Sequence, residues 1–174
     1  MNIRPATPKD VPALLAVYAP YVTDTAITFE YDVPTEADFL QRLLTFSEKF
    51  PYLVAEDDGQ VVGYAYAHAF HTRIGYRYTV ESTVYVERGH RRGGVGRALY
   101  AALESGLKAL GYKNMNACIT YVDVEDEYLT HDSVKFHERM GFSHAAHFHK
   151  CGCKFGRWYD VIWMEKFIGK HTAE

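Results

Sequence analysis

The sequence predicts a single α/β domain of the mixed α+β kind, in which helices flank a central sheet of about six or seven strands. Short runs of alternating apolar and polar residues indicate strands, and longer stretches with apolar residues at helical spacing indicate helices. The chain has 174 residues, enough for one domain to bury most of its apolar surface. We expect this domain to span residues 1–168, followed by a short tail at residues 169–174.

The N-terminal part predicts two helices. Thr7 is a typical N-cap residue, followed by proline and by an acid in the first turn. The apolar residues of this first helix are Val11, Leu14, Leu15, Tyr18 and Val22. Thr35 repeats the start signal, and Phe39, Leu43 and Phe46 give the second helix its apolar face.

The middle of the chain predicts three strands and a helix. The stretch YLVAEDDGQVVGYAYAHAF indicates a hairpin that turns at Asp57, Asp58 and Gly59, and residues 78–86 indicate a third strand. After a turn rich in arginine and glycine, a helix is expected to end at Gly111. Its apolar face consists of Val95, Leu99, Leu103, Leu107 and Leu110.

The C-terminal part predicts a strand at residues 113–121, a short helix at residues 132–140, and strands near residues 143–151 and 158–167. A strand, a crossover helix and a second strand usually form a parallel pair. We therefore expect the strands at residues 78–86 and 113–121 to be parallel neighbours in a mixed sheet.

Composition and charge exclude several classes of protein. A net charge of −3 argues against a general nucleic-acid binder, because neutralising phosphates requires excess lysine and arginine. No apolar run approaches the length of a membrane span, and residues 1–7 lack the features of a secretory signal. Three cysteines, Cys118, Cys151 and Cys153, favour reduced thiols in the cytoplasm. We expect a cytoplasmic protein that binds neither nucleic acid nor membrane.

The arginine- and glycine-rich turn is a candidate anion site. A helix start presents unpaired N–H groups and the positive end of the helix dipole. The residues of this candidate site are Arg91, Arg92, Gly93, Gly94, Val95, Gly96 and Arg97. The turn lacks the Gly-Lys-Ser/Thr of a Walker motif, and Leu99 stands where a dinucleotide-binding pattern would need glycine. A plain glycine-rich turn with solvated arginines is the alternative.

This turn also carries a resemblance to a known family. RRGGVG matches the Arg/Gln-x-x-Gly-x-Gly signature of the GNAT N-acetyltransferases, whose loop holds the pyrophosphate of acetyl-CoA. TVESTVYV, SVKFHERMGF and KFGRWYDV resemble the phosphinothricin and methionine sulfone/sulfoximine acetyltransferase branch, from about residue 3 to about residue 167. The resemblance implies a GNAT fold whose parallel strands splay to admit acetyl-CoA, a homodimer, and direct transfer without a metal or a covalent acetyl-enzyme.

The resemblance also implies which residues contact the cofactor. The backbone of Val84, Tyr85 and Val86 would pair with the pantetheine arm. Ser133 matches the serine of the last helix, but Thr130 stands where the branch usually has asparagine, and threonine lacks the amide's paired donor and acceptor. The preceding segment YVDVEDEYL is longer and more acidic than usual, which bears on substrate choice.

Two residues are candidates for proton transfer. Strand alternation separates Glu81 from its apolar neighbours, and the branch assigns the matching glutamate as general base, acting directly or through water. The alternative is a solvent-facing acid on a half-exposed strand. His137 occupies the position of a tyrosine that donates a proton to the leaving thiolate in many GNAT enzymes. A packed histidine with both nitrogens hydrogen-bonded is equally compatible with the sequence.

Candidate substrate residues are more widely spread. Arg73 or Arg77 could clamp a substrate carboxylate, with surface arginines as the alternative. Phe29, Tyr31, Tyr76 and Trp158 could wall a small pocket, although aromatic residues are more often in the core. Glu81 would contact the substrate as well.

The row His147, His149, Cys151 and Cys153 raises the question of zinc. An ideal strand would aim all four side chains in one direction and spread them over roughly 20 Å, whereas zinc needs converging ligands. We expect no metal site in this row.

Together these observations predict an acetyl-CoA-dependent N-acetyltransferase acting on the primary amine of a small amino-acid-like molecule, with phosphinothricin, methionine sulfoximine and methionine sulfone as the implied substrate class. Two alternatives remain open. One is an acyl-CoA-binding sensor with little turnover, and the other is an acetyltransferase of protein or peptide amines.

Overall fold

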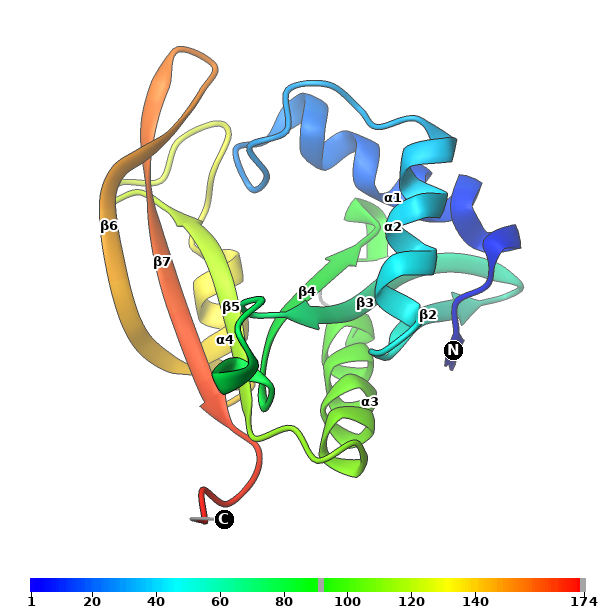
Figure 1. The fold of residues 1–174 in the computed structure, drawn as a ribbon. Coiled ribbons are helices and arrows are strands. Elements are labelled where there is room, and N and C mark those ends of the chain that lie inside the picture. Colours follow the sequence, from blue (N-terminus) through cyan, green and yellow to red (C-terminus); the bar gives the residue numbers. More distant parts are fainter. Residues whose placement is uncertain (91–92, 173–174) are drawn as a thin grey trace.

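The structure, a computed structural model, describes residues 1–90 and 93–172. Its strands form one seven-stranded sheet in the order β1-β2-β3-β4-β5-β7-β6 (Figure 1). The strands are β1 (Asn2–Pro5), β2 (Tyr52–Asp57), β3 (Gln60–Ala69), β4 (Thr79–Val86), β5 (Asn114–Tyr121), β6 (Ser143–Lys154) and β7 (Arg157–Phe167). The helices are α1 (Val11–Asp24), α2 (Glu36–Ser47), α3 (Val95–Ala109) and α4 (Asp132–Arg139), with 3-10 turns η1 (Pro8–Asp10), η2 (Ile74–Tyr76) and η3 (Arg88–His90).

The sheet is mixed, as predicted. β4 and β5 are parallel neighbours joined through α3, whereas the other neighbouring strands run antiparallel. Three details differ from the sequence patterns. β1 has four residues, too few to show alternation. The first predicted helix begins as η1, where Asp10 accepts a hydrogen bond from the Thr7 N–H at 2.7 Å, before α1 starts. β6 extends beyond its predicted end, to Lys154.

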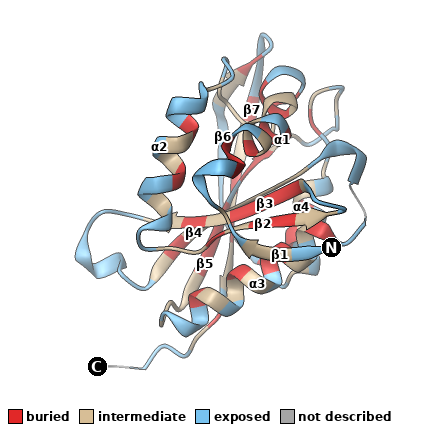
Figure 2. Cartoon of the chain, turned by 90° about the vertical axis from the view of Figure 1, so that its right-hand side faces the viewer, coloured by how far each residue is buried: buried red, intermediate tan, exposed pale blue. Residues whose placement is uncertain are grey.

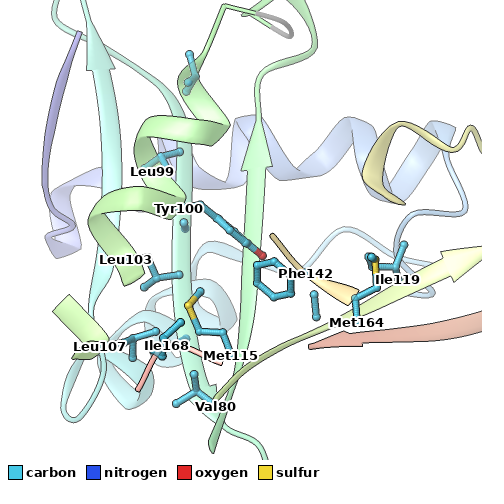
Figure 3. Close-up of a cluster of buried hydrophobic side chains, with 14 of the residues drawn as sticks. Val80, Leu99, Tyr100, Leu103, Leu107, Met115, Ile119, Phe142, Met164 and Ile168 are labelled. Carbon is cyan, nitrogen blue, oxygen red and sulfur yellow. The ribbon is translucent and has the colours of Figure 1, made fainter. Parts of the chain in front are cut away.

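Helices cover both faces of the sheet. α1 and α2 lie on one face and α3 on the other (Figure 2). On the first face, a buried cluster joins the two helices to the aromatic side chains Tyr52 and Tyr64. On the second face, Leu99, Leu103 and Leu107 of α3 pack over the central strands (Figure 3). Their partners in this core cluster include Val80, Met115, Phe142, Met164 and Ile168. These two layers pack against the central strands that carry the site described below.

β4 and β5 separate partway along their length. They pair only at Thr79–Asn114, Val80–Met115 and Glu81–Asn116. Beyond these positions β4 stays paired with β3 as far as Val86, and β5 stays paired with β7 as far as Tyr121. The two central strands therefore diverge after Glu81, which confirms the predicted splayed pair.

β6 and β7 form a long hairpin at the edge of the sheet (Figure 1). The register shifts between Phe148 and Gly152, so three residues of β6 stand opposite Asp160 of β7. Lys150, in the middle of this bulge, has a φ of 49°, which is unusual for a residue with a side chain. The bulge is held by the Lys150 N–H, which donates to Asp160 Oδ1 at 2.7 Å.

Among the described residues, no helix combines the length and the apolar character that a membrane span requires.

Candidate active site

A cavity of about 290 Å³ lies where β4 and β5 diverge. Its walls come from both of these strands, from β3 and β7, from α3 and α4, and from the segment that follows α1. Backbone groups that would pair across an intact sheet are instead directed into this opening. The cavity therefore combines an opening between strands with side chains from most of the domain.

Glu81 stands at the point of divergence, at the last position where β4 pairs with β5. Its side chain lines the cavity and is 24% exposed. Burial raises the pKa of the Glu81 carboxyl above its ordinary value, and His68 opposes this shift. A carboxylate with a raised pKa holds an accepted proton more readily at neutral pH, which suits a general base.

His68 is a neighbour of Glu81 that the sequence patterns did not single out. It lies directly opposite Glu81 in the β3–β4 register, and its Nε2 is 3.7 Å from Glu81 Oε2. The ring stacks on Phe46 at 5.2 Å, and Nδ1 is 3.1 Å from the Ala69 carbonyl oxygen. Because a carbonyl only accepts, Nδ1 carries a hydrogen in this contact. The hairpin register was the signal in the sequence that could have paired His68 with Glu81.

His137 also lines the cavity but is only 4% exposed. Its Nδ1 donates to the Ser133 carbonyl at 2.7 Å, so Nε2 of the neutral ring accepts from the Tyr100 hydroxyl at 3.0 Å. Burial lowers the pKa of His137 to about 4, although the bond to Ser133 opposes this. The ring is therefore neutral at pH 7 and has both nitrogens engaged. This geometry favours the packed alternative over the general acid.

The candidate anion site lies at the start of α3. Gly94 is the N-cap residue, with a φ of 82° that favours glycine, and its carbonyl accepts the first helical hydrogen bond from Ala98 at 3.0 Å. Val95 anchors the helix in the core, Gly93 precedes the cap, and Arg97 is exposed. A Cβ on Gly96 would lie 3.2 Å from the Phe136 ring, so this glycine permits close contact between α3 and α4.

Arg91 and Arg92 lie outside the described residues. The described part of the turn nevertheless has the form of an anion site. Its helix start is fixed by a buried valine and a left-handed glycine, and the N–H groups of the first turn lack intrahelical partners.

The backbone of β4 alternates between its two neighbours. The Glu87 N–H bonds to the Val62 carbonyl of β3 at 2.8 Å, so alternate residues of β4 also direct their polar groups to β3. This pattern directs the backbone of Tyr85 to β3 and the backbone of Val84 and Val86 toward the divergence. The Tyr21 hydroxyl donates to the Val86 carbonyl. Val84 and Val86 are thus better placed than Tyr85 to pair with an extended ligand.

The two candidate residues near α4 lie in different surroundings. Ser133 lines the cavity, whereas Thr130 is exposed and its hydroxyl accepts from the Asp132 N–H at 3.4 Å. The acidic segment before Thr130 is held by Arg157 of β7, which pairs with Asp126 at 3.0 Å and with Glu127 at 2.7 Å. These two acids are therefore bound to the hairpin.

The candidate substrate residues are not all brought together. Phe29 lines the cavity, and its ring lies over Gly152 of β6, where a Cβ would come within 2.1 Å. Arg73 and Arg77 are exposed on the connection between β3 and β4, and neither is among the cavity-lining residues. The Arg77 guanidinium stacks over the Tyr78 ring at 4.5 Å. Trp158, near the hairpin tip, is 64% exposed and also lies outside the cavity lining.

Comparisons with known proteins agree with this architecture. Residues 3–163 match the family model described as acetyltransferase (GNAT) domain. The chain is 35% identical to a phosphinothricin N-acetyltransferase of Streptomyces viridochromogenes over 96% of this chain and 88% of the relative. It is 33% identical to an L-methionine sulfoximine/L-methionine sulfone acetyltransferase of Salmonella typhimurium over 99% of this chain and 98% of the relative.

A solved structure shows the same fold. The GNAT superfamily phosphinothricin acetyltransferase of Sinorhizobium meliloti, in complex with acetyl-CoA, superposes with a TM-score of 0.90 at 33% identity. The match covers 99% of this chain and 91% of the solved one. The family model, the relatives and the fold lead to one conclusion: this chain belongs to the GNAT acetyltransferase family.

Proposed function

We propose that this protein transfers the acetyl group of acetyl-CoA to the primary amine of a small amino-acid-like molecule, of the class that includes phosphinothricin, methionine sulfoximine and methionine sulfone. The position of Glu81 carries the proposal. Its half-buried carboxyl has a raised pKa and stands where β4 and β5 part, beside a cavity sized for a small molecule. The names of the relatives support the substrate class.

Glu81 is the proposed general base. It accepts one proton from the substrate ammonium, directly or through water, and this frees the nitrogen lone pair to attack the thioester carbonyl. The C–N bond forms, the C–S bond breaks, and the second nitrogen proton ends on the CoA sulfur. One proton is thus released overall, and it leaves through Glu81. His68, 3.7 Å from Glu81, is placed to pass that proton toward solvent.

The other residues are assigned binding and positioning roles. Val84 and Val86 offer backbone groups to the pantetheine arm, and the start of α3, from Gly93 to Arg97, offers N–H groups to the pyrophosphate. We propose the same role for Arg91 and Arg92. His137 orients Tyr100, because its Nδ1–H donates to the Ser133 carbonyl and its Nε2 accepts a hydrogen bond from the Tyr100 hydroxyl.

The reaction is tested by acetyl-CoA-dependent thiol release with a panel of amines. The panel contains phosphinothricin, methionine sulfoximine, methionine sulfone, ordinary amino acids, a polyamine and a peptide with a free N-terminus. We expect release with one of the amino-acid analogues, well above a control without amine that accounts for protein thiols. No release with any amine of the panel, the peptide included, while calorimetry still shows acetyl-CoA binding, would contradict the enzymatic proposal and favour an acyl-CoA sensor.

One observation favours a second candidate, an acetyltransferase of protein or peptide amines. A small amino acid needs a partner for its carboxylate, yet Arg73 and Arg77 both lie outside the cavity lining. Arg77→Ala separates the two candidates. If Arg77 clamps the substrate carboxylate, the variant should raise KM for the amino-acid substrate by about tenfold or more. An unchanged KM for the amino acid, together with fast turnover of the peptide, would favour the second candidate.

We further propose that the protein is a cytoplasmic homodimer. The β6–β7 hairpin exposes Phe148, Phe155 and Trp158, with exposed fractions of 52%, 37% and 64%, and large exposed apolar side chains often mark contact surfaces. The three cysteines are free thiols, as expected for a reducing compartment. Sedimentation equilibrium of the wild type and of Trp158→Ser tests the assembly, and a monomeric wild type would contradict it.

A further inference from the structure

We propose that the β6–β7 hairpin binds a late first-row divalent cation, with Zn²⁺ as the expected occupant, through His147, His149 and Asp160. His147 Nε2 lies 2.7 Å and His149 Nδ1 lies 3.0 Å from the same carboxylate oxygen, Asp160 Oδ2. The three ligand atoms all lie within 4.8 Å of one another. This cluster is separate from the acetyl-transfer site, and the proposed function makes no use of it.

The fold builds this cluster with the bulge of β6. Three residues of β6 stand opposite Asp160 alone, and the backbone turns at Lys150, whose φ is 49°. The Lys150 N–H donates to Oδ1 of Asp160, which directs the other oxygen, Oδ2, to the imidazoles. The His147 and His149 rings lie 4.2 Å apart, one on each side of the start of the bulge. The carboxylate is therefore preoriented by the backbone rather than by a side chain.

One of the two imidazoles, that of His147, also packs against an aromatic ring. The Tyr121 ring meets His147 edge-on at 5.3 Å and stacks on His131 at 5.4 Å. His149 is 75% exposed, so little besides Asp160 and the His147 ring confines it, whereas Asp160 is only 16% exposed. The site thus consists of two fixed ligands and one adjustable ligand at the protein surface.

The chemistry and spacing of these ligands suit a borderline metal ion. Two imidazoles and one carboxylate are donors that Zn²⁺, Co²⁺, Ni²⁺ and Cu²⁺ accept, whereas Ca²⁺ and Mg²⁺ prefer oxygen alone. Two ligands at about 2.1 Å from a tetrahedral Zn²⁺ lie about 3.4 Å apart. The nitrogen–oxygen distances of 2.7 Å and 3.0 Å are those of hydrogen bonds, so binding replaces these bonds and moves each imidazole nitrogen slightly away from Asp160 Oδ2. A small rotation of His149 brings its nitrogen onto the ion, and the remaining positions stay open to water.

This set differs from the row His147, His149, Cys151 and Cys153 considered in the sequence. The bulge separates the cysteines from the histidines: the Cys151 thiol faces the Phe148 carbonyl at 3.7 Å, and Cys153 pairs across the hairpin with Trp158. The third ligand comes from β7 instead. Side chains from a single regular strand cannot converge on one ion, but histidines at a bulge can converge on it together with a carboxylate of the opposite strand.

The test uses the full, tag-free chain after treatment with EDTA. Zn²⁺ is titrated by calorimetry, and Co²⁺ is followed by its visible absorption. We expect one ion per chain, and a loss of affinity of about tenfold or more in His147→Gln and in His149→Gln. His144→Gln is the matched control, because His144 lies on the same strand, is 54% exposed and stands 3.8 Å from Glu138, away from the cluster. It should bind like the wild type.

A second control separates imidazole from thiolate ligation. The double variant Cys151→Ser, Cys153→Ser should keep its affinity for Zn²⁺ and its Co²⁺ spectrum. Absence of saturable binding in the wild type would overturn the proposal. So would wild-type affinity for Zn²⁺ in both His147→Gln and His149→Gln, or binding that disappears when the two cysteines are replaced. Far-ultraviolet circular dichroism of each variant confirms that lost binding does not reflect lost folding.

Discussion

Glu81 and Asp160 are both strand carboxylates faced by histidine, yet they behave in opposite ways. Glu81 has one histidine at 3.7 Å, and burial raises its pKa. Burial acts to raise the pKa of Asp160 too, but hydrogen bonds from the Lys150 N–H, His147 and His149 outweigh it and lower the pKa to about 2. The number and length of the hydrogen bonds decide the direction of the shift.

The opposite pKa shifts of Glu81 and Asp160 indicate two different roles for a carboxyl group. A carboxylate that is desolvated and poorly hydrogen-bonded retains a drive to take up a proton, which is the property of a base. A carboxylate with several short donors stays ionised and holds its neighbours in place. Glu81 therefore suits proton transfer, while Asp160 suits the bracing of a bulge and, in our proposal, the binding of a cation.

The largest expected effect tests the base. Glu81→Gln keeps the shape of the side chain but cannot accept the ammonium proton, so kcat/KM should fall by about 10²- to 10⁴-fold. Acetyl-CoA affinity, measured by calorimetry, should not change. Glu48→Gln, at the end of α2, is the matched control and should keep wild-type rates. Wild-type turnover by Glu81→Gln across neutral pH would remove Glu81 from the mechanism.

A second variant asks whether another cavity residue shares the chemistry. His137→Leu removes the imidazole that bonds to the Tyr100 hydroxyl and to the Ser133 carbonyl, and Tyr100 keeps its longer contacts with Ser82. This should cost about 1–3 kcal/mol of unfolding free energy in urea titration. The folded fraction should turn over within about tenfold of the wild type. Tyr100→Phe, which removes the other half of the hydrogen bond, should behave similarly. A loss of about a hundredfold or more in turnover by folded His137→Leu, with Tyr100→Phe unaffected, would restore the general acid.

The third variant addresses Asp160. In Asp160→Ala the Lys150 N–H and two imidazoles lose their acceptor, and the partly exposed bulge should lose about 1–2 kcal/mol of stability in buffer containing EDTA. The exposed Asp123→Ala provides the control and should leave the urea midpoint unchanged. Equal midpoints for Asp160→Ala and the wild type would show that the bulge does not depend on this carboxylate.

The smallest effect concerns His68. Because His68 lowers the pKa of Glu81, its removal in His68→Gln should raise that pKa further and move the acidic limb of the kcat/KM profile to higher pH. The loss at pH 6 should be about threefold to tenfold, and the rates should converge as the pH rises above the limb. In the wild type, the acidic limb of the kcat/KM profile should already fall at a pH above the ordinary pKa of a glutamate side chain. A limb that stays in place or moves to lower pH in the variant would mean that His68 does not act on Glu81.

Local patterns predicted most of the fold. Helix caps at Thr7 and Thr35 and alternation in β2 to β4 depend on neighbouring residues alone, so they can be recognised without tertiary information. The parallel pair followed from the crossover through α3. β1 was missed because its four residues pair at an edge of the sheet and carry no periodic pattern.

The candidate site was only partly predictable. Alternation indicated which face Glu81 occupies, but His68 needed the hairpin register and Tyr100 needed the packing of α3 over β4. The pairing of His147 and His149 with Asp160 depends on a bulge at Lys150. This residue has a left-handed backbone conformation although it is not a glycine. No local pattern marks such a bulge, because the contacts that stabilise it come from the opposite strand.

The residue at position 152, on the outer strand β6, affects the width of the cavity through its contact with Phe29. It lies in β6, outside the cavity lining, yet a methyl group there would overlap the Phe29 ring. Replacing this one hydrogen by a side chain would push an aromatic wall into a new position without altering any residue that touches the substrate. Substrate range in this protein can therefore evolve from the outer strand inward, and saturation mutagenesis at position 152 is a direct route to variants that accept larger or smaller amines.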